Sequence, residues 1–279
     1  MMGQIINGKE IAKDIKVEIK DYIENRVALN KRVPTITSIL VGEDGGSIYY
    51  QNFQEKSALE LGLGFNKIKL SETTSEEELK NIILQLNDDE SVDGIMLLLP
   101  LPKHIAEKNI TNIINPDKDL DCLSDVSMGR FYKGEESYKP CTPNSVITLL
   151  KKSNVGIEGA NVVIIGRSNI VGKPLFQMFL NENATVTICH SRTKNLKEVA
   201  SKADILVVAM GKPKFINEDY VKEGAIVIDV GTSNVEGKIT GDVDFDNVIS
   251  KTSMITPVPG GVGSLTTTLL LRNVCEGLK

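Results

Sequence analysis

The segment VVIIGRSNIVGKP, residues 162–174, decides the fold of this chain. It opens with four β-branched residues in a row, and a strand that is apolar on both faces is typical of the centre of a parallel sheet. Gly166 follows directly, and a helix is expected from about Gly172, with Pro174 in its first turn, where a missing N–H is harmless. This arrangement can bring backbone N–H groups and a helix N-terminus to a phosphate. The segment therefore predicts a nucleotide-binding turn, although a tight turn that binds no ligand would show the same local pattern.

The segment does not match either of the two common phosphate-binding motifs. It lacks the GxGxxG spacing of many dinucleotide-binding turns. Five residues separate its glycines, and Pro174 follows Lys173 where a P-loop needs Ser or Thr to hold magnesium. A P-loop phosphotransferase is therefore disfavoured.

Strands and helices alternate along most of the chain, which predicts an α/β fold. In the C-terminal half the pattern predicts a Rossmann-type, doubly wound parallel sheet. Its further strands are expected over 185–189, 205–209 and 225–229, with helices over 143–151, 172–181, 196–202 and from Leu265 to the end. In the N-terminal half, strands are expected over 35–41, 65–70 and 93–99, with helices over 8–30, 47–61 and 74–87. Residues 103–139 are less regular, and we interpret them as a functional loop followed by a connection between domains.

The end of the second Rossmann strand indicates which dinucleotide is preferred. Folds that bind NAD usually place Asp or Glu there to hold a ribose hydroxyl. Here the strand ends in the donor-rich run His190-Ser191-Arg192-Thr193, with no acid. Arg167 and Arg192 are suited to bracket a 2′-phosphate, which favours NADP. The alternative is that both arginines are solvated surface residues.

Composition excludes several other classes of function. A length of 279 residues predicts about two domains. The net charge is −5 and no basic cluster stands out, so no nucleic acid is expected as a partner. No apolar run approaches the roughly 20 residues that span a bilayer, and the N-terminal residues do not have the pattern of a signal peptide. Four cysteines without zinc or CxxC spacing, and only two histidines, predict no metal site and the reduced thiols of a cytoplasmic protein.

Four further motifs are informative when they are taken together with GRSxxVGxP at 166–174. They are Leu99-Pro100-Leu101-Pro102, Lys118-Asp119-Leu120-Asp121, Pro140-Cys141-Thr142-Pro143 and the run TPVPGGVG at 256–263. In their order and spacing, over essentially the whole length, the chain resembles the methylenetetrahydrofolate dehydrogenase/cyclohydrolase family.

The resemblance implies an N-terminal α/β domain, a Rossmann-type NADP domain, a cleft between them and a homodimer. It divides the chain into a folate-binding catalytic part, 1–138 with 265–279, and a nucleotide-binding part, 139–264. It implies NADP-dependent oxidation of 5,10-methylenetetrahydrofolate. The implied catalytic positions are Tyr50, Gln54, Leu98 and Asp121, and the substrate is expected to contact Tyr50, Leu99, Asp121, Pro259, Gly260 and Gly261. The family's cofactor-binding segments contain Gly166, Arg167, Ser168, Ile170, Ser191 and Thr232, beside Arg192.

Two of these positions depart from the family pattern. Gln54 stands where the family has a catalytic lysine, and Leu98 stands where it has an active-site glutamine. Lys56 matches a second lysine of the family, and two residues on a helix turn it by about 200°, away from the face shared by Tyr50 and Gln54. Lesser departures are Cys122 in place of glycine and Ser264 in place of proline.

The departures affect the family's two reactions unequally. Oxidation converts a methylene bridge between two nitrogens into a delocalised methenyl cation, and no proton has to be removed. Hydrolysis of that cation needs proton transfers, and a tuned acid–base group is typically worth about 100- to 10,000-fold in rate. Gln54 cannot titrate, and Leu98 removes a second polar group. We therefore expect a dehydrogenase with weak or absent cyclohydrolase activity.

Other readings of the function stay open. Another residue can take over proton transfer, so that both activities persist, or the chain can be a non-catalytic folate- or nucleotide-binding module. A Rossmann dehydrogenase for another small substrate would not explain Tyr50, Asp121 and the 256–263 run together.

Overall fold

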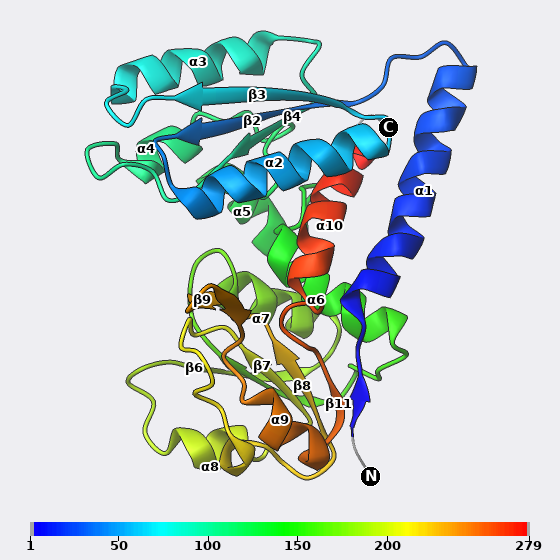
Figure 1. Cartoon of the computed structure of the whole chain (residues 1–279), viewed down its shortest axis with the longest axis vertical. Helices are drawn as coiled ribbons and strands as arrows, with labels where there is room; N and C mark the ends of the chain where they lie inside the picture. The colour runs from blue at the N-terminus through cyan, green and yellow to red at the C-terminus, as the bar shows by residue number, and fades with distance from the viewer. Residues whose placement is uncertain (1–2, 278–279) are drawn as a thin grey trace. The chain divides into compact units, whose positions relative to one another are not determined.

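The structure is a computed structural model that describes residues 3–277, and these form two compact units. Unit 1 contains the residues up to Lys13 and Cys141–Thr266, and unit 2 contains Asp14–Pro140 and the residues from Thr267 onward. Each unit is built on its own parallel sheet (Figure 1). The predicted α/β fold is confirmed.

Unit 1 contains a six-stranded, all-parallel sheet in the order β1-β11-β8-β7-β5-β6. Its strands are β1 (Gln4–Ile5), β5 (Asn161–Ile165), β6 (Thr185–Cys189), β7 (Ile205–Val208), β8 (Ala225–Asp229) and β11 (Thr252–Ile255). The central strands β5 and β7 are almost wholly buried, as their apolar residues on both faces predict. Because β5 lies between β6 and β7, the winding of the chain reverses at β5, which makes the sheet doubly wound.

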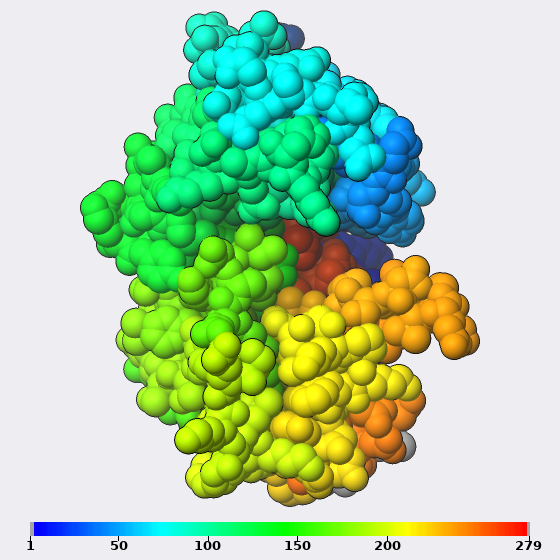
Figure 2. Space-filling view, turned by 90° about the vertical axis from the view of Figure 1, so that its left-hand side faces the viewer, coloured from blue at the N-terminus to red at the C-terminus, as the bar shows by residue number. Residues whose placement is uncertain are grey.

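Helices and a small hairpin complete unit 1. The helices are α6 (Cys141–Lys152), α7 (Gly172–Asn181), α8 (Leu196–Ala200) and α9 (Phe245–Val248), with the 3-10 turns η1 (Glu218–Tyr220) and η2 (Ile249–Lys251). Strands β9 (Ser233–Val235) and β10 (Lys238–Thr240) pair antiparallel. This hairpin projects from the body of unit 1, in orange in Figure 2.

Unit 2 contains a three-stranded parallel sheet with helices on both faces. The strands are β3 (Gly64–Leu70), β2 (Thr35–Val41) and β4 (Gly94–Leu97), in that order. Figure 1 shows α2 and α3 on opposite sides of this sheet. Ile39 of β2 packs in one cluster with Leu79 and Ile83 of α3, whereas Ser38 faces α2. The helices of unit 2 are α2 (Gly45–Glu60), α3 (Glu76–Asp88), α4 (Glu107–Thr111), α5 (Asp125–Lys133) and most of α1 (Gly8–Ala28) and α10 (Gly263–Glu276).

The less regular segment 103–139 holds two helices that the sequence pattern did not predict. They are short, with five residues in α4 and nine in α5, so neither shows enough periodicity to be recognised. Local signals for α5 are present: the Ser124 hydroxyl caps its N-terminus and Gly134 ends it in the left-handed conformation, at φ 72°. The short strands β1 and β11, of two and four residues, were not predicted either.

The N-terminal residues belong to the sheet of unit 1. Gln4 and Ile5 pair with Met254 and Ile255 of β11, so the contacts place the residues up to Lys13 with the nucleotide-type sheet. The predicted division placed these residues in the folate-binding part. That functional division remains a prediction.

All four cysteines are free thiols and are buried. Among residues 3–277, the helices are either too short or too polar to cross a membrane.

Candidate active site

The turn after β5 has a backbone that requires glycine at two positions. Gly166 adopts φ 144°, and a Cβ there would collide with the carbonyl oxygen of Ala209. A Cβ at Gly172 would collide with the carbonyl oxygen of Gly166. The Ser168 hydroxyl accepts hydrogen bonds from the N–H groups of Val171 (3.1 Å) and Gly172 (3.4 Å), which fixes the entry into α7. The result is a tight cradle of the kind that lets a phosphate approach the backbone.

The predicted cofactor residues gather at one edge of the six-stranded sheet. Gly166 follows β5, Ser191 and Arg192 follow β6, and Thr232 follows β8, all at the carboxyl ends of parallel strands. Ligands of doubly wound sheets bind at this edge, where the winding reverses. Arg167, Ser168, Ile170, Ser191, Arg192 and Thr232 are all exposed.

The donor-rich turn after β6 is ordered by its own hydrogen bonds. The Thr193 hydroxyl accepts from the N–H of His190 at 2.8 Å, and His190 Nδ1 accepts from the N–H of Arg192 at 3.2 Å. His190 therefore shapes the turn. None of the ion pairs among the described residues involves Arg167 or Arg192. Both guanidinium groups can therefore bind an anion.

Two buried aspartates support the same edge and were missed by the sequence analysis. The Asp242 carboxylate is fully buried and accepts hydrogen bonds from the N–H groups of Met210, Gly211 and Lys212 at 2.7–2.9 Å, directly after β7. Asp229, at the end of β8, accepts from three further N–H groups on either side of the hairpin. Burial raises the pKa of Asp229 to about 6. These carboxylates fix the loops beside the cofactor edge.

In unit 2, helix α2 carries the predicted catalytic positions Tyr50 and Gln54, and Gln54 packs against the sheet. Asp44 caps the helix by accepting from the Ser47 N–H at 2.8 Å. Gln54 is 0% exposed, and Tyr50, one turn earlier, is half-buried. Lys56 points to solvent and pairs with Glu60 at 3.9 Å. The prediction that Lys56 faces away from Gln54 is confirmed.

Leu98 lies on the sheet face that α2 covers. The ladder pairs Ser38 with Met96 and continues with a hydrogen bond from the Leu98 N–H to the Ile39 carbonyl at 2.9 Å. Side chains two residues apart on a strand share a face, so Leu98 lies on the same side as Ser38, which contacts Gln54 at 3.3 Å. Leu98 is 3% exposed, and Leu99 beside it is half-buried and precedes a cis proline.

Asp121 is the last residue of the Lys118-Asp119-Leu120-Asp121 motif, and Lys118 and Asp119 fix the backbone of this motif. The Lys118 ammonium donates to the carbonyls of Leu86, Asn87 and Asp89 at 2.8–2.9 Å, which holds the end of α3. Burial lowers the Lys118 pKa. Asp119 forms a parallel bridge with Ile95 of β4.

The Asp119 carboxylate also accepts from the N–H groups of Leu123 and Ser124 at 2.8–2.9 Å. The motif is therefore largely structural, and its last residue, Asp121, is half-buried. Cys122 follows at φ 56°, a left-handed conformation that explains why glycine suits this position.

The Pro259–Gly261 loop lies in unit 1, packed against the start of α1. The Gly260 carbonyl accepts from the Gly8 N–H at 2.9 Å, and a Cβ at Gly8 would collide with the Gly261 carbonyl. Gly260 itself adopts φ 114°. The structure thus brings Tyr50, Gln54, Leu98 and Asp121 into unit 2, while the loop and the cofactor residues belong to unit 1.

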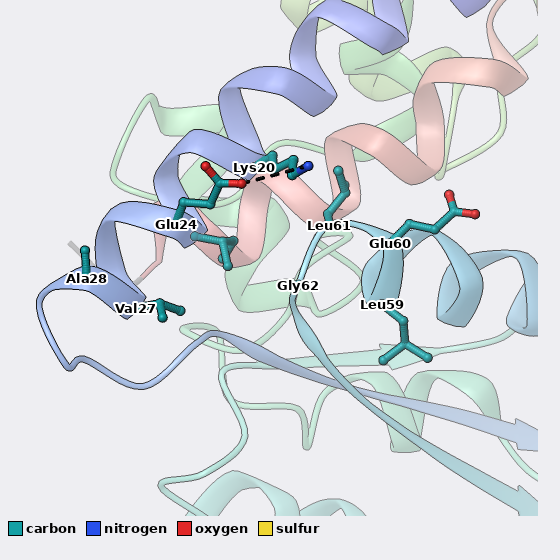
Figure 3. A pocket seen from close by; sticks show the side chains of 9 residues that line it. Lys20, Glu24, Val27, Ala28, Leu59, Glu60, Leu61 and Gly62 are labelled. Atoms are coloured by element: carbon teal, nitrogen blue, oxygen red, sulfur yellow. Dashed lines mark ion pairs between the residues drawn. The ribbon is translucent and has the colours of Figure 1, made fainter.

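A separate hollow lies in unit 2, away from these residues. A cavity of about 500 Å³ separates the C-terminal half of α1 from the end of α2, between side chains such as Val27 and Leu59 (Figure 3). None of the predicted site residues lines it, and we assign no function to it.

Comparison with known proteins identifies the family. The model of the tetrahydrofolate dehydrogenase/cyclohydrolase catalytic domain matches residues 6–121, and the model of that family's NAD(P)-binding domain matches residues 140–279. The chain belongs to this family. Among its tetrahydrofolate dehydrogenase/cyclohydrolase relatives, the bifunctional protein FolD of Clostridium perfringens is 70% identical over 277 residues, which cover 99% of this chain and 100% of the relative.

Solved structures of the same family have the same fold. The bifunctional FolD enzyme of Campylobacter jejuni superposes with a TM-score of 0.96 at 40% identity, covering 98% of both chains. The Trypanosoma brucei methylenetetrahydrofolate dehydrogenase–cyclohydrolase, solved with NADP and an inhibitor, superposes with a TM-score of 0.94 at 34% identity, covering 99% of this chain and 97% of that one. The recognition made from the sequence motifs is confirmed.

Proposed function

We infer that this chain oxidises 5,10-methylenetetrahydrofolate to 5,10-methenyltetrahydrofolate with NADP as hydride acceptor, in one-carbon metabolism. The observation that carries this proposal is family membership over both units, combined with a complete glycine cradle and two exposed arginines at the cofactor edge. The related Trypanosoma brucei enzyme was solved with NADP, which supports the choice of cofactor.

The residues of unit 1 suit NADP. The cradle at Gly166 and Gly172 leaves room where a Cβ would block the backbone, and the N-terminus of α7 favours an anion there. Arg167 and Arg192 offer bidentate donors to the 2′-phosphate. NADP, when bound, accepts a hydride from the one-carbon unit.

The residues of unit 2 bind and orient the folate in this proposal. Asp121 accepts hydrogen bonds from the pterin, and Tyr50 and Leu99 contact the pterin. Pro259, Gly260 and Gly261 are further substrate contacts in this proposal. The reaction needs the one-carbon unit to be held against the nicotinamide ring, with water kept out. No protein group has to take a proton in this step.

The second family reaction is weak or absent in this proposal. Hydrolysis of the methenyl cation needs a group that moves protons, and Gln54 is a fully buried amide. Leu98, which lies on the same sheet face as the Gln54 partner Ser38, adds no polar atom. The alternative of full bifunctionality is favoured by the name of the Clostridium perfringens relative.

Assembly and location follow the family expectation. We propose a homodimer that uses the edge strand β6, because an edge strand offers unpaired backbone groups to a second copy. Four free, buried thiols support a cytoplasmic location. Light scattering on the purified chain tests the dimer: a monomer at micromolar concentration would contradict it.

A paired assay tests the proposed reaction. The full chain is mixed with methylenetetrahydrofolate and either NADP or NAD, and the absorbance of the reduced cofactor is followed. In parallel, loss of methenyltetrahydrofolate is measured without cofactor. We expect oxidation that is faster with NADP, and hydrolysis far slower than oxidation. Comparable rates would support bifunctionality, and no reduction of either cofactor would support a non-catalytic binding module.

A further inference from the structure

Three polar side chains are buried together where α2 packs on β2. Ser38 and Gln54 are 0% exposed and Gln51 is 4% exposed. Gln51 Nε2 donates to the Ser38 carbonyl oxygen at 3.0 Å and to Ser38 Oγ at 3.3 Å. Ser38 Oγ lies 3.3 Å from Gln54 Oε1 and donates to it. We call this chain of hydrogen bonds the Gln51–Ser38–Gln54 relay.

The direction of the relay follows from the chemistry of its atoms. A backbone carbonyl only accepts hydrogen bonds, so the Gln51 amide must turn its nitrogen toward Ser38. Ser38 Oγ then receives a hydrogen from Gln51, and its own single hydrogen is left for Gln54. Gln54 must therefore turn its oxygen toward Ser38 and its nitrogen away.

The amide nitrogen of Gln54 is left without a partner. Within the described residues, Gln54 Nε2 is buried and has no hydrogen-bond acceptor. A buried donor that stays unpaired is costly, and such groups in native proteins are often kept for a functional purpose. Tyr50 lies one turn away on the same face of α2 and is half-buried.

We propose that Ser38 is a positioning residue, which holds the Gln54 amide so that its NH₂ group donates a hydrogen bond to a carbonyl oxygen of the bound tetrahydrofolate derivative. This inference rests on the proposed function and adds the kind of contact that Gln54 makes. A carbonyl is the suitable acceptor for a chemical reason. The two nitrogens beside the one-carbon unit share their lone pairs with the forming cation, so a hydrogen bond to either of them opposes oxidation.

The contact has a defined kinetic signature. A carbonyl oxygen outside the reacting bonds accepts the hydrogen bond equally in the ground state and the transition state, so its loss raises KM and leaves kcat unchanged. A neutral hydrogen bond of this kind is worth roughly three- to tenfold in KM. An amide NH₂ cannot give up its proton, so no change in the pH profile accompanies the loss.

A double-mutant cycle with Ser38→Ala and Gln54→Met tests the inference. In Ser38→Ala, Gln51 keeps its bond to the backbone carbonyl of residue 38, so the variant is expected to fold. Gln54→Met conserves volume in the buried site. We expect each single variant to raise the KM for methylenetetrahydrofolate about three- to tenfold, with kcat and the KM for NADP within about twofold. The double variant is expected to show no larger KM than Gln54→Met alone, because Ser38 acts only through Gln54.

Two further variants serve as controls. Ser38→Cys keeps a weak donor of similar size and is expected to restore part of the affinity for folate. Thr37→Val removes a buried hydroxyl from the opposite face of β2, where it accepts a hydrogen bond from the Asn66 side chain at 3.4 Å. Thr37→Val is expected to leave every kinetic constant unchanged, although it lowers the thermal midpoint.

The outcomes separate this inference from the proposed function. An active wild-type enzyme whose KM for folate is unchanged in Ser38→Ala, or whose two substitutions multiply in effect, overturns the positioning role alone. A wild-type chain that neither oxidises nor binds methylenetetrahydrofolate, the latter measured by calorimetry, overturns the proposed function and this inference with it.

Discussion

The substitution pair Gln54→Lys with Leu98→Gln is expected to raise the hydrolysis of methenyltetrahydrofolate. Position 54 is fully buried, and complete desolvation lowers a lysine pKa from about 10.4 by up to about three to five units. The Ser38 hydroxyl, now 3.3 Å from Gln54, can accept from the ammonium and opposes part of that shift. A net shift of roughly three units brings the pKa close to neutrality, where a lysine can both accept and donate a proton.

The size of the gain follows from the value of general acid–base catalysis. A suitably tuned group contributes about 100- to 10,000-fold, or roughly 2.7–5.5 kcal/mol of barrier. We expect the hydrolysis rate to rise by at least about 100-fold, with an inflection in its pH profile that the wild type lacks. The assay follows the absorbance of methenyltetrahydrofolate between about pH 6 and pH 9, the range that spans the shifted lysine pKa.

A further substitution in the double variant supplies the control. Lys56 is exposed and pairs with Glu60, so Lys56→Gln is expected to leave the new activity intact. The reasoning is refuted if the double variant folds and oxidises methylenetetrahydrofolate but hydrolyses the product no faster than the wild type. Dependence of the new activity on Lys56 would refute it equally.

Three other predictions concern the backbone cradle, the structural lysine and the buried acid. Gly166→Ala places a Cβ against the Ala209 carbonyl at φ 144° and is expected to raise the KM for NADP more than tenfold while folate binding, measured by calorimetry, is retained. Lys118→Met leaves three carbonyls at the end of α3 without their donor and is expected to destabilise the protein by about 2–3 kcal/mol in urea unfolding; a loss below about 0.5 kcal/mol would contradict the anchoring role. Asp229 has a pKa raised to about 6 by burial, so the folded state holds a proton that the unfolded state has released. Between about pH 4 and pH 6 its contribution to stability therefore falls as pH rises, by up to ~3 kcal/mol. Urea unfolding across this range, with Asp229→Asn as reference, checks the sign; a difference independent of pH would contradict it.

Local patterns predicted those parts of the site that depend on neighbouring residues. The β-branched run before Gly166 was sufficient to place a central strand and a glycine turn, because strand, turn and helix are consecutive. Helical periodicity predicted that Lys56 faces away from Gln54, and this is confirmed, because Gln54 is buried and Lys56 is exposed. Family motifs supplied Leu98 and Asp121, and their roles remain proposals.

Features that depend on distant residues were not predictable in this way. Asp242 supports a loop about thirty residues earlier in the chain, and no local pattern marks an aspartate as the acceptor for remote N–H groups. Lys118 belongs to a motif that suggested function, yet its ammonium holds the end of a helix about thirty residues away. The relay through Ser38 was hidden for the same reason, since Ser38 and Gln54 meet only when α2 folds onto β2.

The chain passes between the two units three times, and this has a consequence for its synthesis and dissection. Unit 1 takes its outer strand β1 from the start of the chain, and unit 2 takes most of α10 from the end. In α10, Asn273 donates to the carbonyls of Leu120 and Lys139 at 2.9 and 3.3 Å. A fragment that stops near residue 140 lacks this helix. Unit 2 therefore cannot complete its packing on the ribosome until the residues of α10 have emerged. Any attempt to produce unit 2 without unit 1 must therefore join α10 to the fragment that ends near residue 140, by fusion or circular permutation.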